Sequence, residues 1–121
     1  MSAEDNKLSL CTSDYKWHGP GGQERRGVDA MREMLEGYLG PFPGLKMQVH
    51  ELLVDGDKTI NRFTITGKHT GPLGPIPASG NEIKLGGINI VRHEGGKMTE
   101  EWENFDELAM MQQVGAIPAI G

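Results

Sequence analysis

The segment from Met98 to Asp106, MTEEWENFD, places several acids around one tryptophan and precedes a helix-forming run. In an extended chain alternate side chains share a face. One face would carry Met98, Glu100, Trp102, Asn104 and Asp106, and the other Thr99, Glu101 and Glu103. The first face mixes apolar and polar groups, as the wall of a ligand cavity does, whereas the second is polar throughout. The pattern therefore predicts that Trp102, Met98 and Asn104 line a cavity that ends on Asp106.

Asp106 has two distinct interpretations. A carboxyl that is partly withdrawn from water has a raised pKa, which suits it to proton transfer near neutral pH. The same residue directly precedes ELAMMQQ, where an aspartate is a favoured helix N-cap. The two roles compete for the same carboxylate oxygens, and the spacing alone leaves both open.

The composition narrows the class of protein. A chain of 121 residues predicts a single domain, residues 1–121, that is large enough to bury a core. The net charge of −5 and the lack of a Lys/Arg cluster argue against nucleic acid as a partner. One cysteine, Cys11, cannot form an internal disulfide, and no apolar run approaches the length of a membrane span. We therefore expect a cytoplasmic protein with no membrane partner.

The hydrophobic period predicts the elements that position these residues. Apolar residues at three- and four-residue spacing predict a helix over about 24–39, and a shorter helix should cover about 107–114. The strands are expected at about 45–54, 59–69, 81–93 and 98–106, joined largely by hairpin turns. Gly86 and Gly87 invite a bulge or sharp curvature in the third strand. One main helix, four antiparallel strands and a terminal helix indicate the α+β class.

Alternation along the strands also assigns side chains to faces. In the second strand Phe63 and Ile65 share a face with Asn61 and, if the strand is regular to its end, with His69, while Arg62 lies on the opposite face. In the third strand both faces carry aliphatic residues, which predicts a centre covered on both sides.

The longer motifs resemble the SnoaL-like polyketide (ester) cyclase family. GKMTEEWENFDELAMMQQVGAIP is similar to its C-terminal signature, with Gly-Lys, Glu-Trp, an Asp four residues later and Gln-hydrophobic-Gly. Upstream, DYKWHGPGG, the Phe-Pro strand, the Asp-Gly-Asp hairpin, the Gly-x-His-x-Gly corner and INIVRHEGGK resemble family segments in the family's order. The resemblance extends over about residues 13–118.

The resemblance implies a cone-shaped α+β barrel, shared with ketosteroid isomerase and nuclear transport factor 2, whose strongly curved sheet encloses an apolar pocket. It implies that Asp106 acts as acid/base in an intramolecular aldol closure, without metal or cofactor. Such chemistry also needs a donor that polarises the carbonyl. The donors considered are His18 and His69 and, more weakly, Arg92, Arg62 and Asn89. Phe63 and Trp102 would be further substrate contacts.

Family members usually begin with a longer helical segment, so residues 1–12 are expected to be a shortened N-terminal segment that is either poorly ordered or atypical. Apolar surface left without that helix would favour a homodimer with a sheet-mediated interface. Two functions stay open. The first is a cofactor-independent cyclase, isomerase or lyase acting on a small, largely apolar carbonyl compound. The alternative is a non-catalytic ligand-binding or dimeric assembly module in which Asp106 only caps the last helix.

Overall fold

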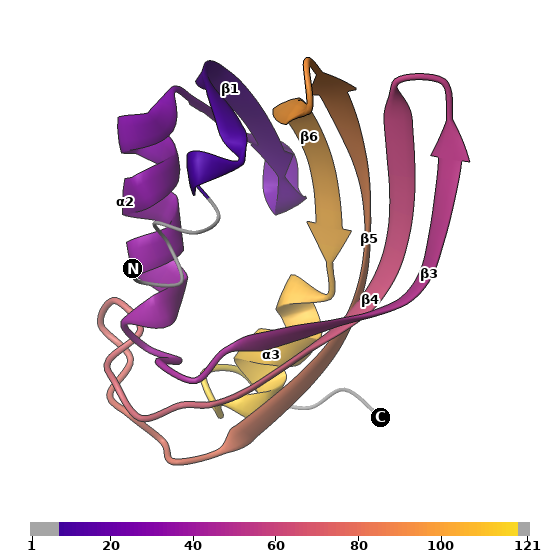
Figure 1. The fold of residues 1–121 in the computed structure, drawn as a ribbon. Helices are drawn as coiled ribbons and strands as arrows, with labels where there is room; N and C mark the ends of the chain where they lie inside the picture. The colour runs from indigo at the N-terminus through magenta and orange to yellow at the C-terminus, as the bar shows by residue number, and fades with distance from the viewer. Residues whose placement is uncertain (1–7, 119–121) are drawn as a thin grey trace.

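The computed structural model describes residues 8–118, which form one mixed sheet with two helices on one face (Figure 1). The strands are β1 (Cys11–Gly19), β2 (Gln23–Arg26), β3 (Lys46–Asp55), β4 (Lys58–Lys68), β5 (Glu82–Glu94) and β6 (Lys97–Phe105). The helices are α2 (Val28–Leu39) and α3 (Glu107–Gln113), and a 3-10 turn η1 (Pro20–Gly22) joins β1 to β2. The α+β class is confirmed.

The strand order is β2-β1-β6-β5-β4-β3. Strands β3 to β6 form an antiparallel meander, in which each strand pairs with the next. Strand β1 lies parallel to β6, with Trp17 opposite Glu101 and His18 opposite Trp102. The N-terminal hairpin is therefore added to the sheet through the last strand of the chain.

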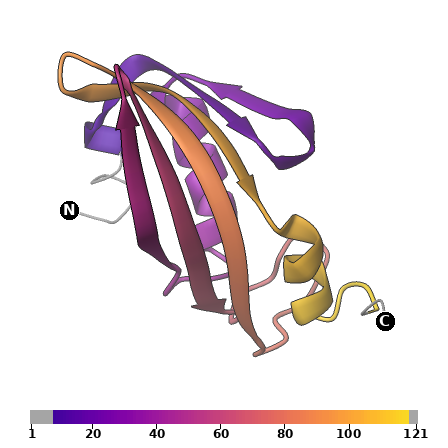
Figure 2. The ribbon, with the colours of Figure 1, turned by 90° about the vertical axis from the view of Figure 1, so that its right-hand side faces the viewer.

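Both helices lie on the same side of the sheet, which we call the inner face; the opposite side is the outer face (Figure 2). Inner-face side chains from β4 and β5 pack with α3 in one core cluster: Phe42, Phe63, Ile65, Ile83, Leu85, Met110 and Val114. Inner-face side chains of β1 pack with α2 in a second cluster: Leu8, Cys11, Tyr15, Trp17, Met31 and Met34. The site described below lies where the two clusters meet.

The four strands and the terminal helix predicted from the sequence agree with the structure to within one or two residues. The main helix begins at Val28, later than predicted, because residues 23–26 form β2. Its N-cap is Gly27, whose φ of 84° is readily adopted only by glycine. Of the N-terminal segment 1–12, residues 1–7 lie outside the described residues, and Cys11 and Thr12 already belong to β1.

Three expectations about the sheet are wrong. It has six strands rather than four, it is mixed rather than antiparallel, and it stays open without curling strongly or closing into a barrel (Figure 1). The register passes through Gly86 and Gly87 without a bulge. A Cβ on Gly87 would lie 2.4 Å from Cε1 of Phe63, so this glycine makes room for a buried ring.

The outer face of β5 is not covered. Ile88 and Ile90 are exposed there, contrary to the expectation that this strand is enclosed on both sides. None of the helices among residues 8–118 combines the length and apolarity needed to cross a membrane.

Candidate functional site

Strand β6 presents the opposite face to the interior from the one predicted. Glu101 and Glu103 are buried on the inner face, 1% and 7% exposed, whereas Trp102 is 37% exposed on the outer face. The alternation itself holds from Thr99 to Glu103, whereas Met98 packs against the second inner-face cluster. The prediction went wrong because it treated tryptophan as the stronger signal for burial. Acids can be buried when donors reach them, and here β1 supplies those donors.

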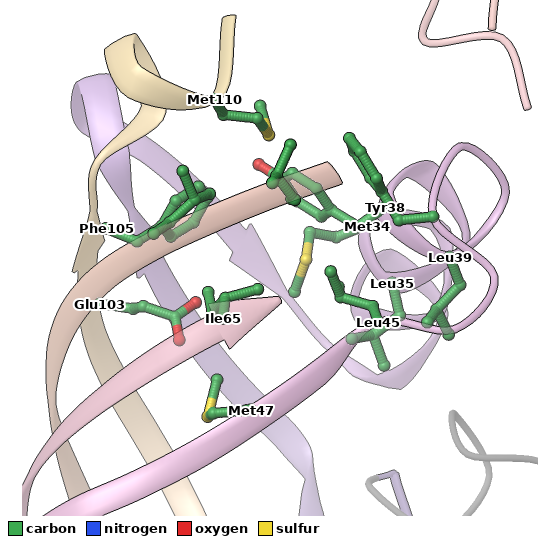
Figure 3. Close-up of a pocket in the computed structure, with 13 residues that line it drawn as sticks. Met34, Leu35, Tyr38, Leu39, Leu45, Met47, Ile65, Glu103, Phe105 and Met110 are labelled. Carbon is green, nitrogen blue, oxygen red and sulfur yellow. The ribbon is translucent and has the colours of Figure 1, made fainter. Parts of the chain in front are cut away.

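An apolar cavity of about 100 Å³ lies between α2, the inner face and α3 (Figure 3). Most of its lining is aliphatic, aromatic or thioether: Met34, Leu35, Leu39, Phe42, Leu45, Met47, Ile65, Ile83, Leu85, Phe105 and Met110. Of the described lining residues, only two carry a side-chain oxygen or nitrogen, Glu103 on β6 and Tyr38 on α2. A mostly apolar cavity with a few placed polar groups is the usual form of a small-molecule site.

Among residues 8–118, Glu103 is the only ionisable carboxyl that lines this cavity. The indole of Trp17, itself fully buried, donates from Nε1 to Oε1 of Glu103 over 3.2 Å. The alternation of β6 points the side chain inward, and the parallel pairing with β1 brings the indole beside it. The site therefore holds an oriented carboxyl group against an apolar space, which is the arrangement needed for acid–base chemistry on an apolar compound.

A second buried carboxyl, Glu101, is held by hydrogen bonds across three strands. The Tyr15 hydroxyl donates to Oε1, and Asn89 Nδ2 donates to Oε2 over 2.9 Å. Asn89 Oδ1 in turn accepts from Asn61 Nδ2 over 2.9 Å. Burial, followed by the charge of Glu101, raises the pKa of Tyr15 far above its usual range, so the phenol remains a donor. Asn89, predicted to contact substrate, instead helps to hold Glu101.

Asp106 is the N-cap of α3. Its side chain accepts from the backbone N–H of Ala109 over 3.0 Å, and it is exposed outside the cavity. The capping interpretation is thus confirmed. The proposed acid–base role of Asp106 has no support from this location, because the cavity is lined by Glu103 three residues earlier.

His18 lies on the outer face, away from the cavity. Its ring stacks on Trp102 with centroids 5.3 Å apart, and its Nε2 is 2.7 Å from Oε2 of Glu100. Arg92 also reaches Glu100, with NH2 to Oε1 at 3.3 Å. The hydrogen bond from His18, followed by that from Arg92, lowers the pKa of Glu100. These residues form a polar cluster on the sheet surface.

His69 is fully buried beyond the end of β4. The backbone N–H of Ser79 donates to Nδ1 over 3.2 Å, and the Ser79 hydroxyl is 2.9 Å from the same nitrogen. Because Nδ1 accepts from an amide, its lone pair is occupied and the ring proton lies on Nε2. The ring packs against Phe42 with centroids 5.3 Å apart, which indicates a role in holding the 69–81 loop.

The other predicted contacts are divided between the core and the surface. Phe63 is buried in the first core cluster, and Met98 packs against the second. Arg62 pairs with Glu51 on the outer face, and Asn104 is exposed. None of the ten site residues predicted from the sequence lines the cavity. Its polar lining residues, Glu103 and Tyr38, were not among those predicted.

No group of three or more His, Cys, Asp or Glu side chains among residues 8–118 is arranged to hold a metal ion. The two buried acids of β6 are bound to Tyr, Trp and Asn donors.

Comparison with known proteins identifies the family. The model of the SnoaL-like polyketide cyclase family matches residues 3–114. This chain belongs to that family. A search of curated proteins finds no significant match.

Solved structures show the same fold. A candidate SnoaL-like polyketide cyclase from Jannaschia sp. CCS1 is 23% identical with a TM-score of 0.85, over 95% of this chain and 80% of that one. TsrD from Streptomyces laurentii is 29% identical with a TM-score of 0.80, and the match covers 95% of this chain and 84% of TsrD. AclR from Streptomyces galilaeus, a candidate hydroxylase, is 22% identical with a TM-score of 0.82, and the match covers 94% of this chain and 71% of AclR. Because these names span different reactions, the reaction of the SnoaL-like chain has to be argued from its own site.

Proposed function

We propose that this SnoaL-like protein is a cofactor-independent cyclase, isomerase or lyase that acts by acid–base catalysis on a small, largely apolar carbonyl compound. The observation that carries the proposal is Glu103, the one ionisable carboxyl that the described part of the chain places in the apolar cavity, where the Trp17 indole orients it. Family membership supports a polyketide-like substrate. Glu103 takes the acid–base role that the sequence had suggested for Asp106.

The reaction requires one group that can take and return a proton. The Glu103 carboxylate accepts a proton from the carbon beside the substrate carbonyl, and the C–H electron pair forms an enolate. In a cyclase the enolate carbon then attacks a second carbonyl of the same molecule, which forms the C–C bond and leaves an alkoxide. Glu103 returns the proton to that oxygen, so the carboxylate is regenerated.

The cavity limits the part of the substrate that reacts. At about 100 Å³ it is smaller than the engineered cavity of about 150 Å³ that binds benzene. A wide, open groove adjoins it and shares Met34, Tyr38 and Met110 as lining residues. A larger molecule would place its reactive end in the cavity and the remainder in the groove. The flexible side chains of the two methionines suit such an opening.

Proton exchange tests this proposal without requiring the complete reaction. We expect the protein, incubated in deuterated water with β-keto esters and enolisable polyketide fragments, to catalyse deuterium incorporation beside the carbonyl of at least one compound. The measurement is NMR of the substrate proton against a protein-free control. Binding of such compounds with no accelerated exchange would contradict the enzymatic proposal and favour the non-catalytic binding module.

We further propose that two copies associate through the outer face as a homodimer. Leu53, Ile60, Ile90 and Trp102 are neighbours in the register of β3, β4, β5 and β6, and they form one apolar row across the sheet. Leu53, Ile90 and Trp102 in this row are exposed. A row of this kind can pack on its own copy across a two-fold axis, which is the commonest symmetry of soluble oligomers.

Light scattering should give twice the chain mass at micromolar concentration. Ile90→Lys should shift the population to monomer without unfolding it, because the side chain is on the surface. Lys84→Glu, on the same strand but outside the row, is the matched control and should leave the dimer intact. A stable wild-type monomer would overturn the dimer proposal.

A further inference from the structure

The cavity contains one polar group that the proposed acid–base step does not use, the hydroxyl-bearing side chain of Tyr38. It projects from α2, while Glu103 projects from the sheet on the other side (Figure 3). The other lining side chains that the structure describes are apolar. A polar group in such a place is costly to bury unless it gains a hydrogen-bond partner, and a bound substrate can supply one.

We infer that Tyr38 donates a hydrogen bond to the substrate carbonyl oxygen whose neighbouring carbon exchanges a proton with Glu103. The inference rests on the proposed function and makes it more specific. When Glu103 removes the proton, negative charge develops on that oxygen, and a donor aimed at it stabilises the enolate more than the ketone. The assignment makes Tyr38 a catalytic residue, since it touches the reacting group.

The Tyr38 ring is positioned by the strand that carries Glu103. It meets Phe105 edge to face, with centroids 5.8 Å apart and planes at 81°. Phe105 follows Glu103 by two residues on β6, so both side chains point to the inner face. One strand therefore fixes the carboxyl and, through Phe105, the position of the phenol across the cavity.

The surroundings of Tyr38 keep it a donor. Burial, followed by the charges of Glu107 and Glu103, raises the pKa of its phenol above the usual value, although Gln23 and Arg25 act in the opposite direction. The hydroxyl is therefore protonated at neutral pH. A protonated phenol keeps an O–H that it can donate to a bound acceptor.

The location of Tyr38 also indicates the substrate class. It lines both the cavity and the adjoining groove. The polarised carbonyl would thus lie where the two spaces meet, with the acidic C–H directed inward to Glu103 and the rest of the molecule toward the groove. This geometry fits an open-chain or cyclic ketone with an acidic C–H beside the carbonyl, as in a 1,3-dicarbonyl compound.

Tyr38→Phe tests the assignment, because it removes the hydroxyl and keeps the ring that contacts Phe105. With a compound that exchanges, kcat should fall by about 10²-fold with little change in KM, the usual scale for losing one such donor. Thermal unfolding should show that the variant is folded. An unchanged kcat would overturn the inference, and the proposed function would still stand if Glu103→Gln abolished exchange.

A binding assay tests, independently of turnover, whether Tyr38 donates a hydrogen bond to the oxygen of a bound compound. 2-Naphthol carries its oxygen on an sp² carbon, as the enol form of a ketone does, so it serves as the probe and naphthalene as its matched control. Tyr38→Phe should weaken 2-naphthol binding about tenfold, as for one lost hydrogen bond, and leave naphthalene binding unchanged. Equal affinity of 2-naphthol for both proteins would overturn the inference.

Discussion

Replacing Glu103 with glutamine should reduce turnover of any compound that the protein exchanges by about 10²-fold or more, the scale of a lost general acid–base. Glutamine has the same shape, and its amide oxygen can still accept from the Trp17 indole. What it cannot do is take and return a proton. The effect should therefore appear in kcat, with the substrate affinity and the free energy of unfolding changed much less.

The matched control is Asp106→Asn. Asparagine caps helices about as well as aspartate, so the hydrogen bond from Ala109 and the stability of α3 should be kept. Because Asp106 lies outside the cavity, turnover should stay at the wild-type level. A loss of turnover in Asp106→Asn with full activity in Glu103→Gln would return the acid–base role to Asp106.

Tyr15→Phe should lower the free energy of unfolding by about 1–3 kcal/mol, the cost of leaving a buried polar group without its partner. The change removes only the hydroxyl that donates to Glu101 and leaves the packed ring in place. Denaturant unfolding monitored by circular dichroism gives the value. Tyr38→Phe is the matched control. It is the same chemical change at a half-buried site, and it should cost less.

A double-mutant cycle tests whether the loss comes from this bond. Glu101→Met removes the acceptor and keeps an unbranched side chain of similar length. If Tyr15 and Glu101 stabilise the fold through their mutual hydrogen bond, the double variant should lose less stability than the sum of the two single losses. Strict additivity would show that the two residues act separately.

The sequence predicts most elements of this fold because their signals are local. Period-two runs and the Asp-Gly-Asp turn predict the four strands β3, β4, β5 and β6, and the spacing of apolar residues predicts most of α2. Strand β1 has a signal of the same kind, since Tyr15 and Trp17 alternate with Asp14, Lys16 and His18. That alternation could have identified it. Its parallel pairing with β6 could not be predicted, because partners so far apart in sequence leave no local pattern.

The site was missed for the same reason. Whether Glu103 or Trp102 points inward depends on which face β1 and α2 cover, and alternation along β6 alone is symmetric between the two faces. The hydrophobicity of tryptophan favoured the wrong choice. The burial of Glu101 and Glu103 depends on donors from Tyr15, Trp17 and Asn89, which only the tertiary structure brings together.

The pairing of β1 with β6 has a consequence for how the protein is made. During synthesis the N-terminal part of a chain emerges first, so residues 11–19 are available long before their partner, residues 97–105. Strands β3, β4 and β5 can pair with one another in the meantime, and β1 can pair with β2, but the side chains of Tyr15 and Trp17 do not yet have Glu101 and Glu103 as acceptors. Glu103 and its indole donor thus meet only when the last strand is in place, and a nascent chain that stops before β6 carries most of the sheet but no site.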